Sequence, residues 1–234
     1  MSGETFGGPR RLRAGFLGRV GYRDAFRLQE LCRDALLRGE GDETLLLLEH
    51  PPVFTLGRSA DPADVVAGAE WLRGRGIEVV ETDRGGQVTY HGPGQLVGYP
   101  ILNLHPDRRD LRRYVRDLQE VLVDTLRDFG IAARGGEGEG IGVWVEERGV
   151  PAKIASIGVH LKRWVTTHGF ALNVAPELEN FGGIVACGMP DVRMTSMHAL
   201  TGEHIPLERV AGVCMRYLVA RFDRELVPLG GRDQ

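Results

Sequence analysis

The sequence predicts an α/β protein, more closely an α+β arrangement, in which a mixed β-sheet is flanked by helices. Short apolar or β-branched segments occur beside segments whose apolar residues recur at three- and four-residue steps, so both strands and helices are expected. The two kinds of segment do not alternate strictly, which argues against a doubly wound parallel sheet. No repeat or linker divides the 234 residues, so we expect one domain over residues 1–234.

The first half of the chain contains two helices and several strands. An apolar segment at 12–17 leads into a helix at 22–38, whose inner stripe would contain Phe26, Leu28, Leu31, Cys32, Ala35 and Leu36. Residues 44–49 are typical of a buried strand that Pro51 and Pro52 terminate. Asp61 or Asp64 can cap a second helix that runs to Arg73. A strand at 77–81, a glycine-dense loop and a strand at 96–104 follow.

The second half begins with the clearest helix, at 107–129, which Gly130 terminates. The glycine run at 134–142 contains acidic residues and lacks the GxGxxG spacing, so a flexible hairpin turn is favoured over a phosphate-binding loop. Strands are predicted at 141–146, 152–161 and 165–174, and a last helix at 206–226. Its inward residues would be Leu207, Val210, Cys214, Tyr217, Leu218 and Phe222.

Composition excludes several classes of protein. A net charge of −3 is not that of a nucleic-acid-binding protein. No apolar run is long enough to span a membrane, and residues 1–13 lack the apolar region of a secretory signal, so a cytoplasmic location is expected. Three cysteines without close spacing predict neither a disulfide framework nor a metal site.

The segment at 84–95 is the strongest candidate for a binding site. Four glycines and a proline in twelve residues let the backbone approach a ligand or another strand closely. Its polar side chains are those of Arg84, Gln87, Thr89, Tyr90, His91 and Gln95. A tight hairpin with polar loop residues is the alternative interpretation.

The cysteines differ in context. Cys32 and Cys214 lie on apolar helix stripes, where a thiol acts as a small hydrophobic group. Cys187 lies between turn residues and beside Gly188, so it is the candidate nucleophile. Because a free thiol is mostly protonated at neutral pH, that role requires a neighbouring cation or base. Lys153 is the candidate for this cation or base. Strand alternation would place it on one face with Ala155 and Ile157, and the alternative is a lysine on the protein surface.

At these residues the sequence resembles the LipB family of lipoyl(octanoyl) transferases, over about residues 16–226. The first matching block is Arg84-Gly-Gly-Gln-Val-Thr-Tyr-His-Gly-Pro-Gly-Gln95, followed by residues 96–102. Three further blocks match in order: Lys153-Ile-Ala-Ser-Ile-Gly158, His168-Gly-Phe-Ala-Leu-Asn173, and Cys187-Gly188 followed by Thr195-Ser196. Phe170 and Ala186 depart from the pattern, in which Leu and Pro are commoner.

The resemblance implies the fold of biotin and lipoate protein ligase catalytic domains. It implies transfer of an octanoyl group from octanoyl-acyl carrier protein to a lysine of lipoyl domains, such as those of 2-oxoacid dehydrogenases and the glycine cleavage H protein. Cys187 would carry the acyl group as a thioester, and Lys153 would act as the base. No metal, cofactor, nucleic acid or membrane is implied. The implied substrate-binding residues are Arg84, Gly85, Gly86, Gln87, Val88, Thr89, Tyr90, His91, Ser156, Ile157, Gly158, Gly169, Phe170 and Ala171.

Three other functions compete with this one. An ATP-dependent lipoate ligase on the same fold would also keep a lysine at position 153, but would not need a thiol at position 187. A non-catalytic acyl-binding protein would leave both residues without a role. A thiol hydrolase would release free octanoate, which distinguishes it from a transferase.

Overall fold

The structure, a computed structural model, describes residues 10–106, 108–189 and 191–230. The strands are β1 Arg10–Arg19, β2 Glu43–Glu49, β3 Val53–Leu56, β4 Glu78–Glu81, β5 Val88–His91, β6 Gln95–Ile101, β7 Ala133–Gly136, β8 Gly142–Glu147, β9 Val150–Lys162, β10 Val165–Asn173 and β11 Arg224–Pro228. The α-helices are α1 Tyr22–Arg38, α2 Ala69–Gly74, α3 Leu111–Asp128, α4 Met197–Thr201 and α5 Leu207–Phe222. Short 3₁₀ segments are η1 Pro62–Asp64, η2 Gly138–Gly140, η3 Leu178–Gly183 and η4 Ala186–Gly188.

An eight-stranded mixed sheet forms the centre of the fold, in the order β11-β1-β2-β6-β10-β9-β8-β7. Its β11–β1 and β1–β2 pairs are parallel and the other pairs are antiparallel. A second, three-stranded sheet has the order β4-β3-β5. The predicted mixed sheet flanked by helices is therefore confirmed.

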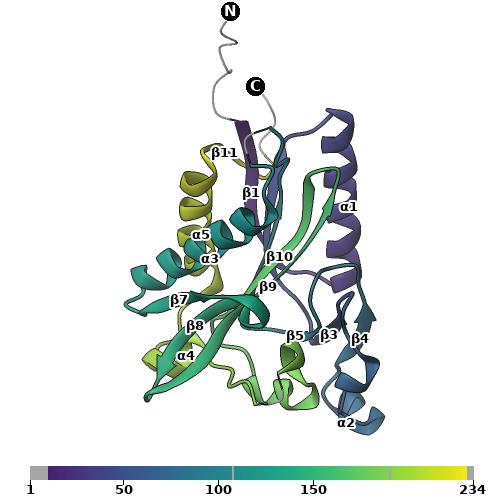
Figure 1. Cartoon of the computed structure of the whole chain (residues 1–234), viewed down its shortest axis with the longest axis vertical. Helices are drawn as coiled ribbons and strands as arrows, with labels where there is room; N and C mark the ends of the chain where they lie inside the picture. Colours follow the sequence, from purple (N-terminus) through teal and green to yellow (C-terminus); the bar gives the residue numbers. More distant parts are fainter. Residues whose placement is uncertain (1–9, 107, 190, 231–234) are drawn as a thin grey trace, which may run out of the picture.

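Helices cover both faces of the large sheet (Figure 1). On one face α1 packs over Leu46, Leu48 and Val97. On the other face the apolar side of α3 and the helix α5 form the main core with the strands, around residues such as Leu118 and Leu218. Each side chain of this size that is fully buried contributes roughly 1.5–3 kcal/mol to folding.

Several predicted boundaries need correction. The helix predicted at 206–226 ends at Phe222, because Asp223 has a left-handed backbone (φ 53°) and β11 follows it to pair with β1. The second predicted helix is two short pieces, η1 and α2, and the Asp61 side chain caps the first. Leu31, predicted to face inward, is 69% exposed.

The loop, the glycine run and the start of the long helix also differ in part from the prediction. The loop predicted before 96–104 contains the strand β5, and its partner strand β3 was not predicted either. Each strand has only four residues and pairs with a segment distant in sequence, so neither has a clear local pattern. The glycine run at 134–142 is a hairpin between β7 and β8, as predicted, but its first three residues belong to β7. The long helix begins at Leu111 with Asp110 as its N-cap; its predicted first residue, Asp107, and residues 1–9 of the predicted non-signal segment lie outside the described residues.

No helix within the described ranges is both long and apolar enough to cross a membrane.

Candidate active site

A cavity of about 1390 Å³ lies against the strands β9 and β10 and brings the predicted residues together. Cys187, Lys153 and thirteen of the fourteen predicted substrate-binding residues line it. The exception is Tyr90, whose ring packs between Phe54 and Phe181 and whose hydroxyl accepts a hydrogen bond from Asn180. The Tyr90 side chain therefore packs behind the residues that line the cavity and does not line it itself.

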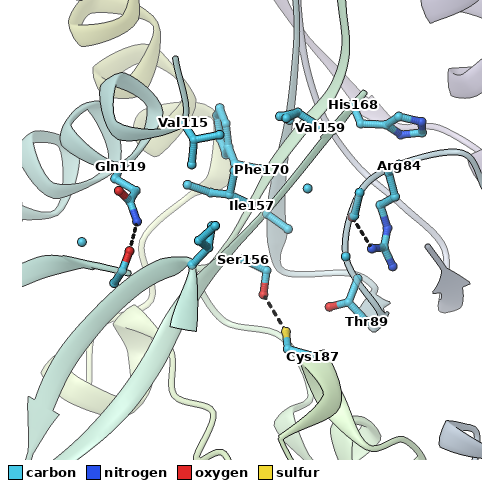
Figure 2. A pocket seen from close by; sticks show the side chains of 18 of the residues that line it. Arg84, Thr89, Val115, Gln119, Ser156, Ile157, Val159, His168, Phe170 and Cys187 are labelled. Atoms are coloured by element: carbon cyan, nitrogen blue, oxygen red, sulfur yellow. Dashed lines mark hydrogen bonds between the residues drawn. The ribbon is translucent and has the colours of Figure 1, made fainter. Parts of the chain in front are cut away.

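Cys187 is held in a left-handed turn. Its backbone has φ 57° and ψ 22°, and Gly188 follows with φ 66°. A Cβ atom at Gly188 would lie 1.7 Å from Oε1 of Gln87, so a larger residue would displace the Gln87 side chain and would also strain the positive φ. The turn presents the Cys187 thiol to Lys153, whose Nζ lies 3.3 Å from Sγ, and to Ser156, whose Oγ lies 4.0 Å from Sγ (Figure 2).

A β-bulge in β9 places Lys153 on this side of the sheet. Trp144 of β8 pairs with Lys153, but the preceding Val143 pairs with Ala155, so Ile154 is the extra residue. Beyond the bulge, Ala155 and Ile157 face the main core, whereas Lys153 points to Cys187. The predicted sharing of one face by Lys153, Ala155 and Ile157 is therefore wrong, because strict alternation does not hold across a bulge.

Lys153 is also almost completely buried, with 1% of its surface exposed. Its Nζ lies 5.6 Å from the centre of the Trp144 ring, a favourable contact for a cation. Its main chain pairs with residues 193–195, since Lys153 N donates to Arg193 O and Thr195 N donates to Lys153 O. These contacts fix the lysine beside the sulfur rather than in solvent.

Arg84 is buried and forms hydrogen bonds to neutral acceptors. Its guanidinium donates to the hydroxyl and carbonyl oxygens of Thr55 and to the carbonyl oxygens of Gly85 and Gln87. Burial lowers the pKa of Arg84. The guanidinium therefore closes the 84–87 loop onto β3, and Gly85 N extends the contact by donating to Val159 O of β9.

A chain of side-chain hydrogen bonds orients His91. The ring donates from Nδ1 to Oε1 of Gln95, and Nε2 of Gln95 donates to Oδ1 of Asn173. Nδ2 of Asn173 in turn donates to the carbonyl of Thr195. These four residues belong to the sequence blocks described above, and the network connects β5, β6 and β10 to the segment after Cys187.

The histidines of the site are buried. Burial lowers the pKa of His91 to about 3 and that of His50 to about 4. His50 Nδ1 donates to the carbonyl of Val20, so its Nε2 accepts the Tyr99 hydroxyl hydrogen. Burial is also the main cause that lowers the pKa of His168, although Asp83 at 2.7 Å opposes it. His91 and His168 line the cavity, and His50 lies behind His91 with its ring centre 5.8 Å away.

Sequence reasoning missed two groups of cavity residues. Tyr22, Tyr99 and His168 come from α1, β6 and β10; Tyr99 and His168 lie in segments that match the family, but none of the three was predicted as a site residue. The second group lies on α3, from Leu111 to Arg127, and combines charged residues with Leu111 and Val115, which belong to the apolar pattern of the helix. Neither group has a local signal, because each faces the cavity only after the sheet has formed.

No group of three or more His, Cys, Asp and Glu side chains that could hold a metal ion occurs among residues 10–106, 108–189 and 191–230.

Comparison with known proteins identifies the family. Residues 21–219 match the model of the lipoyl protein ligase A/B catalytic domain. The chain is 48% identical over 213 residues to an octanoyltransferase of Myxococcus xanthus, covering 90% of this chain but 59% of that protein. It is 49% identical over 212 residues to an octanoyltransferase of Solibacter usitatus, covering 91% and 93% of the two chains.

Solved structures support the fold. A bi-partite lipoate protein ligase from Thermoplasma acidophilum, solved in a study of that ligase and its E2 lipoyl domain, superposes with a TM-score of 0.72 at 17% identity, over 95% of this chain and 87% of that one. A biotin protein ligase from Aquifex aeolicus gives 0.52 at 14% identity, over 90% and 70%. The fold expected from the resemblance is therefore confirmed, and the chain belongs to the LipB family of octanoyltransferases, within the lipoyl protein ligase A/B catalytic domain family.

Proposed function

We propose that this protein transfers an octanoyl group from octanoyl-acyl carrier protein to a lysine of a lipoyl domain, through a thioester on Cys187. The contact between Lys153 Nζ and Cys187 Sγ, at 3.3 Å in a buried cavity, carries the proposal. A positive charge at this distance stabilises a thiolate, the form of cysteine that attacks a thioester. The relatives named octanoyltransferase support the acyl group.

The first step forms the acyl-enzyme. The Cys187 thiolate attacks the thioester carbonyl of the donor, a bond forms between Sγ and the acyl carbon, and the bond to the donor sulfur breaks. Lys153 gives its proton to the departing thiolate, so the carrier leaves as a thiol and Lys153 becomes a neutral amine. Because the incoming thioester is already activated, the step needs no nucleotide.

The second step reverses the proton transfer. The neutral amine of the target lysine attacks the acyl carbon, an amide bond forms, and the bond to Cys187 Sγ breaks. Lys153 accepts the proton that the attacking nitrogen loses, which restores the ammonium and thiolate pair. Lys153 can fill both roles because an amine, unlike a guanidinium, can lose its proton.

The β9 edge supplies the best candidate to stabilise the oxyanion. Val159 O accepts from Gly85 N, so the main-chain groups of Val159 point away from β10. In an antiparallel ladder this direction alternates, so the N–H of Ile157 also points away from β10, while those of Ser156 and Gly158 point towards it. Among the main-chain N–H groups of Ser156, Ile157 and Gly158, that of Ile157 is therefore the favoured oxyanion donor.

The sequence predicts that Cys32 and Cys214 are structural, and their surroundings agree with this. Burial raises the pKa of the Cys214 thiol to about 12, and burial also raises that of Cys32. Both side chains pack with apolar residues on their helices. The Cys187 assignment can therefore be tested by mutation of each cysteine separately.

Incubation with octanoyl-acyl carrier protein should add the mass of one octanoyl group to the protein, removable by neutral hydroxylamine. The change Cys187→Ser should abolish this adduct, whereas Cys32→Ala and Cys214→Ala should retain it. Intact mass spectrometry measures all three. A hydroxylamine-sensitive adduct that persists in Cys187→Ser would refute the assignment.

The competing functions predict other products. A lipoate ligase would modify a lipoyl domain from free octanoate and ATP without any donor thioester. A hydrolase would release octanoate from the acyl-enzyme in the presence of a lipoyl domain. A transferase should give acylated lipoyl domain in proportion to the donor consumed, and quantification of the two octanoyl products distinguishes the three.

A further inference from the structure

The cavity has two arms that meet near Cys187. The closed arm lies between the 84–91 segment and the sheet face that α1 covers, and its wall residues Arg84, His91, Tyr99 and His168 are at most 7% exposed. The α3 arm lies between α3 and the β7–β8 turn, and its rim residues Leu111 and Ile141 are 43% and 40% exposed. One arm is therefore buried, and the other opens to solvent.

Strand β9 separates the arms. Beyond the bulge, Ser156 points to Cys187, whereas Ile157 and Val159 pack on the α3 side. Figure 2 shows Val115, Gln119 and Ile157 on one side of β9, with Arg84, Thr89 and His168 on the other. β8 pairs with β9 only as far as Ala155, so among the described residues the edge of β9 after Ala155 has no partner strand on that side. The two arms of the cavity join around this edge.

The five arginines between residues 108 and 116, two before α3 and three in its first turns, have different surroundings. Arg108 is bound to Asp117, Arg109 stacks on the Trp164 ring, and Arg113 lies 4.0 Å from Asp117. Arg112 and Arg116 line the α3 arm instead, and among the described residues neither has a carboxylate within 4 Å. Being one helical turn apart, these two side chains lie on the same face and can converge on one anion.

The carboxylates of this arm do not compensate these two charges. Glu120 and Asp124 are paired with Arg221. Glu137, from the turn after β7, is the remaining carboxylate among the described cavity residues. The end of the arm near Arg112 and Arg116 thus combines an apolar floor of Val115, Ile157 and Val159 with two guanidinium groups. The exposed N-cap carboxylate of Asp110 is attracted by both of them without forming an ion pair within 4 Å.

We infer that the α3 arm binds the phosphopantetheine arm of the acyl donor, with its phosphate between Arg112 and Arg116. The inference rests on the proposed function. The donor carries a phosphodiester, a chain with apolar methyl groups, and a thioester at its tip, and it must enter from solvent while its acyl chain becomes buried. Gln119 binds Gly142 O beside Lys153, and Arg112 lies seven residues, roughly 10 Å, further along the helix. In this arrangement the phosphate lies near Arg112 and Arg116, and the thioester lies at the other end of the arm, near Lys153 and Cys187.

Small-molecule acyl donors test whether the α3 arm binds the phosphate, because they lack the carrier protein and its surface. The donors are octanoyl-4′-phosphopantetheine and octanoyl-pantetheine, which differ only in the phosphate, and the readout is the rate of Cys187 acylation by intact mass. Wild-type protein at subsaturating donor should react faster with the phosphorylated donor. The double change Arg112→Ala and Arg116→Ala should lower that rate about tenfold or more, with the rate for octanoyl-pantetheine unchanged. The matched double change Arg109→Ala and Arg113→Ala, which removes the same charge outside the cavity, should preserve the preference.

Three outcomes would overturn the inference. Equal rates for the two donors with wild-type protein would mean that no phosphate is bound. A loss confined to octanoyl-acyl carrier protein would mean that the arginines contact the carrier protein itself, and a loss confined to transfer from acyl-Cys187 would mean that they dock the lipoyl domain. Failure of wild-type protein to be acylated by every donor would instead refute the proposed function.

Discussion

At the residue scale, the proposed chemistry depends on two side chains that are 34 positions apart in the sequence. Lys153 is buried on a strand, and Cys187 lies in a left-handed turn, a conformation that costs a non-glycine residue roughly 1–2 kcal/mol. The surrounding contacts, above all the fit of Gly188 against Gln87, hold this turn in place. The strain is thus located at the residue that we propose as the nucleophile.

The change Lys153→Arg separates charge from proton transfer. A guanidinium still stabilises a thiolate but remains protonated, so octanoyl uptake should survive better than transfer to the acceptor lysine. Transfer should fall roughly 10²- to 10⁴-fold, the usual contribution of general acid–base catalysis. Single-turnover acylation and deacylation, followed separately, measure the two steps.

Lys162 provides the control, because it is exposed at the end of β9. Lys162→Arg should leave both steps unchanged. A Lys153→Arg protein within about threefold of wild type in both steps, well below the general acid–base range, would restrict Lys153 to the role of a charge.

At the element scale, the bulge in β9 decides which residues face the thiol. If β9 were a regular strand with strict alternation, Lys153 would lie on the core side with Ala155 and Ile157. The partner strand accommodates the bulge through Gly142, which has φ 143° and lies next to the Lys153 side chain. A Cβ atom there would come within 2.6 Å of Lys153 Cε and 2.5 Å of Ala155 O.

Gly142→Ala should therefore destabilise the protein by about 1–3 kcal/mol and slow the acylation of Cys187, because the lysine must move. Urea unfolding and single-turnover mass spectrometry measure the two effects. Gly212 is a matched control: it is exposed on α5, and a Cβ atom there would meet no neighbouring side chain within 4 Å. Gly212→Ala should stabilise the protein by about 0.5–1 kcal/mol without changing acylation. Full activity and stability in Gly142→Ala would contradict the role given to this contact.

At the scale of the whole molecule, the two sheets meet around buried histidines. His50 follows β2 of the large sheet and His91 ends β5 of the small one, with ring centres 5.8 Å apart. Burial lowers the pKa of both rings, to about 4 and about 3. The folded protein therefore excludes protons that the unfolded chain binds once the pH falls below about 6.5.

Stability should consequently fall as the pH decreases from about 6.5 towards 4, by roughly 1 kcal/mol per histidine per pH unit. Above pH 7 these two groups contribute no pH dependence, since both states are neutral. Urea unfolding at several pH values gives the slope. His91→Gln should flatten it by about one proton, whereas His204→Gln, at an exposed position, should leave it unchanged. Identical slopes in all three proteins would show that the buried histidines are not responsible for the pH dependence.

The sequence by itself determined the long helices and most central strands, and it singled out the candidate reactive groups. Apolar periodicity over a helix of 18 residues such as α3, or a run such as that of β2, is a local property that burial must satisfy. Cys187 differs from Cys32 and Cys214 in its immediate neighbours, and the glycine-rich segment at 84–95 is visible without a partner. Four blocks in order then identified the family.

Only the tertiary structure decided how these groups meet. The bulge at Ile154 arises from pairing with β8, and β3, β5 and β11 are short strands stabilised by partners distant in sequence. Tyr90 lies in a predicted binding segment yet faces a separate apolar cluster. The sequence gives no means of distinguishing the five arginines between residues 108 and 116. The packing decides which of them form ion pairs, which one stacks on an aromatic ring and which two line the cavity. Such long-range contacts depend on the closure of the sheet, so no local pattern in the chain encodes them.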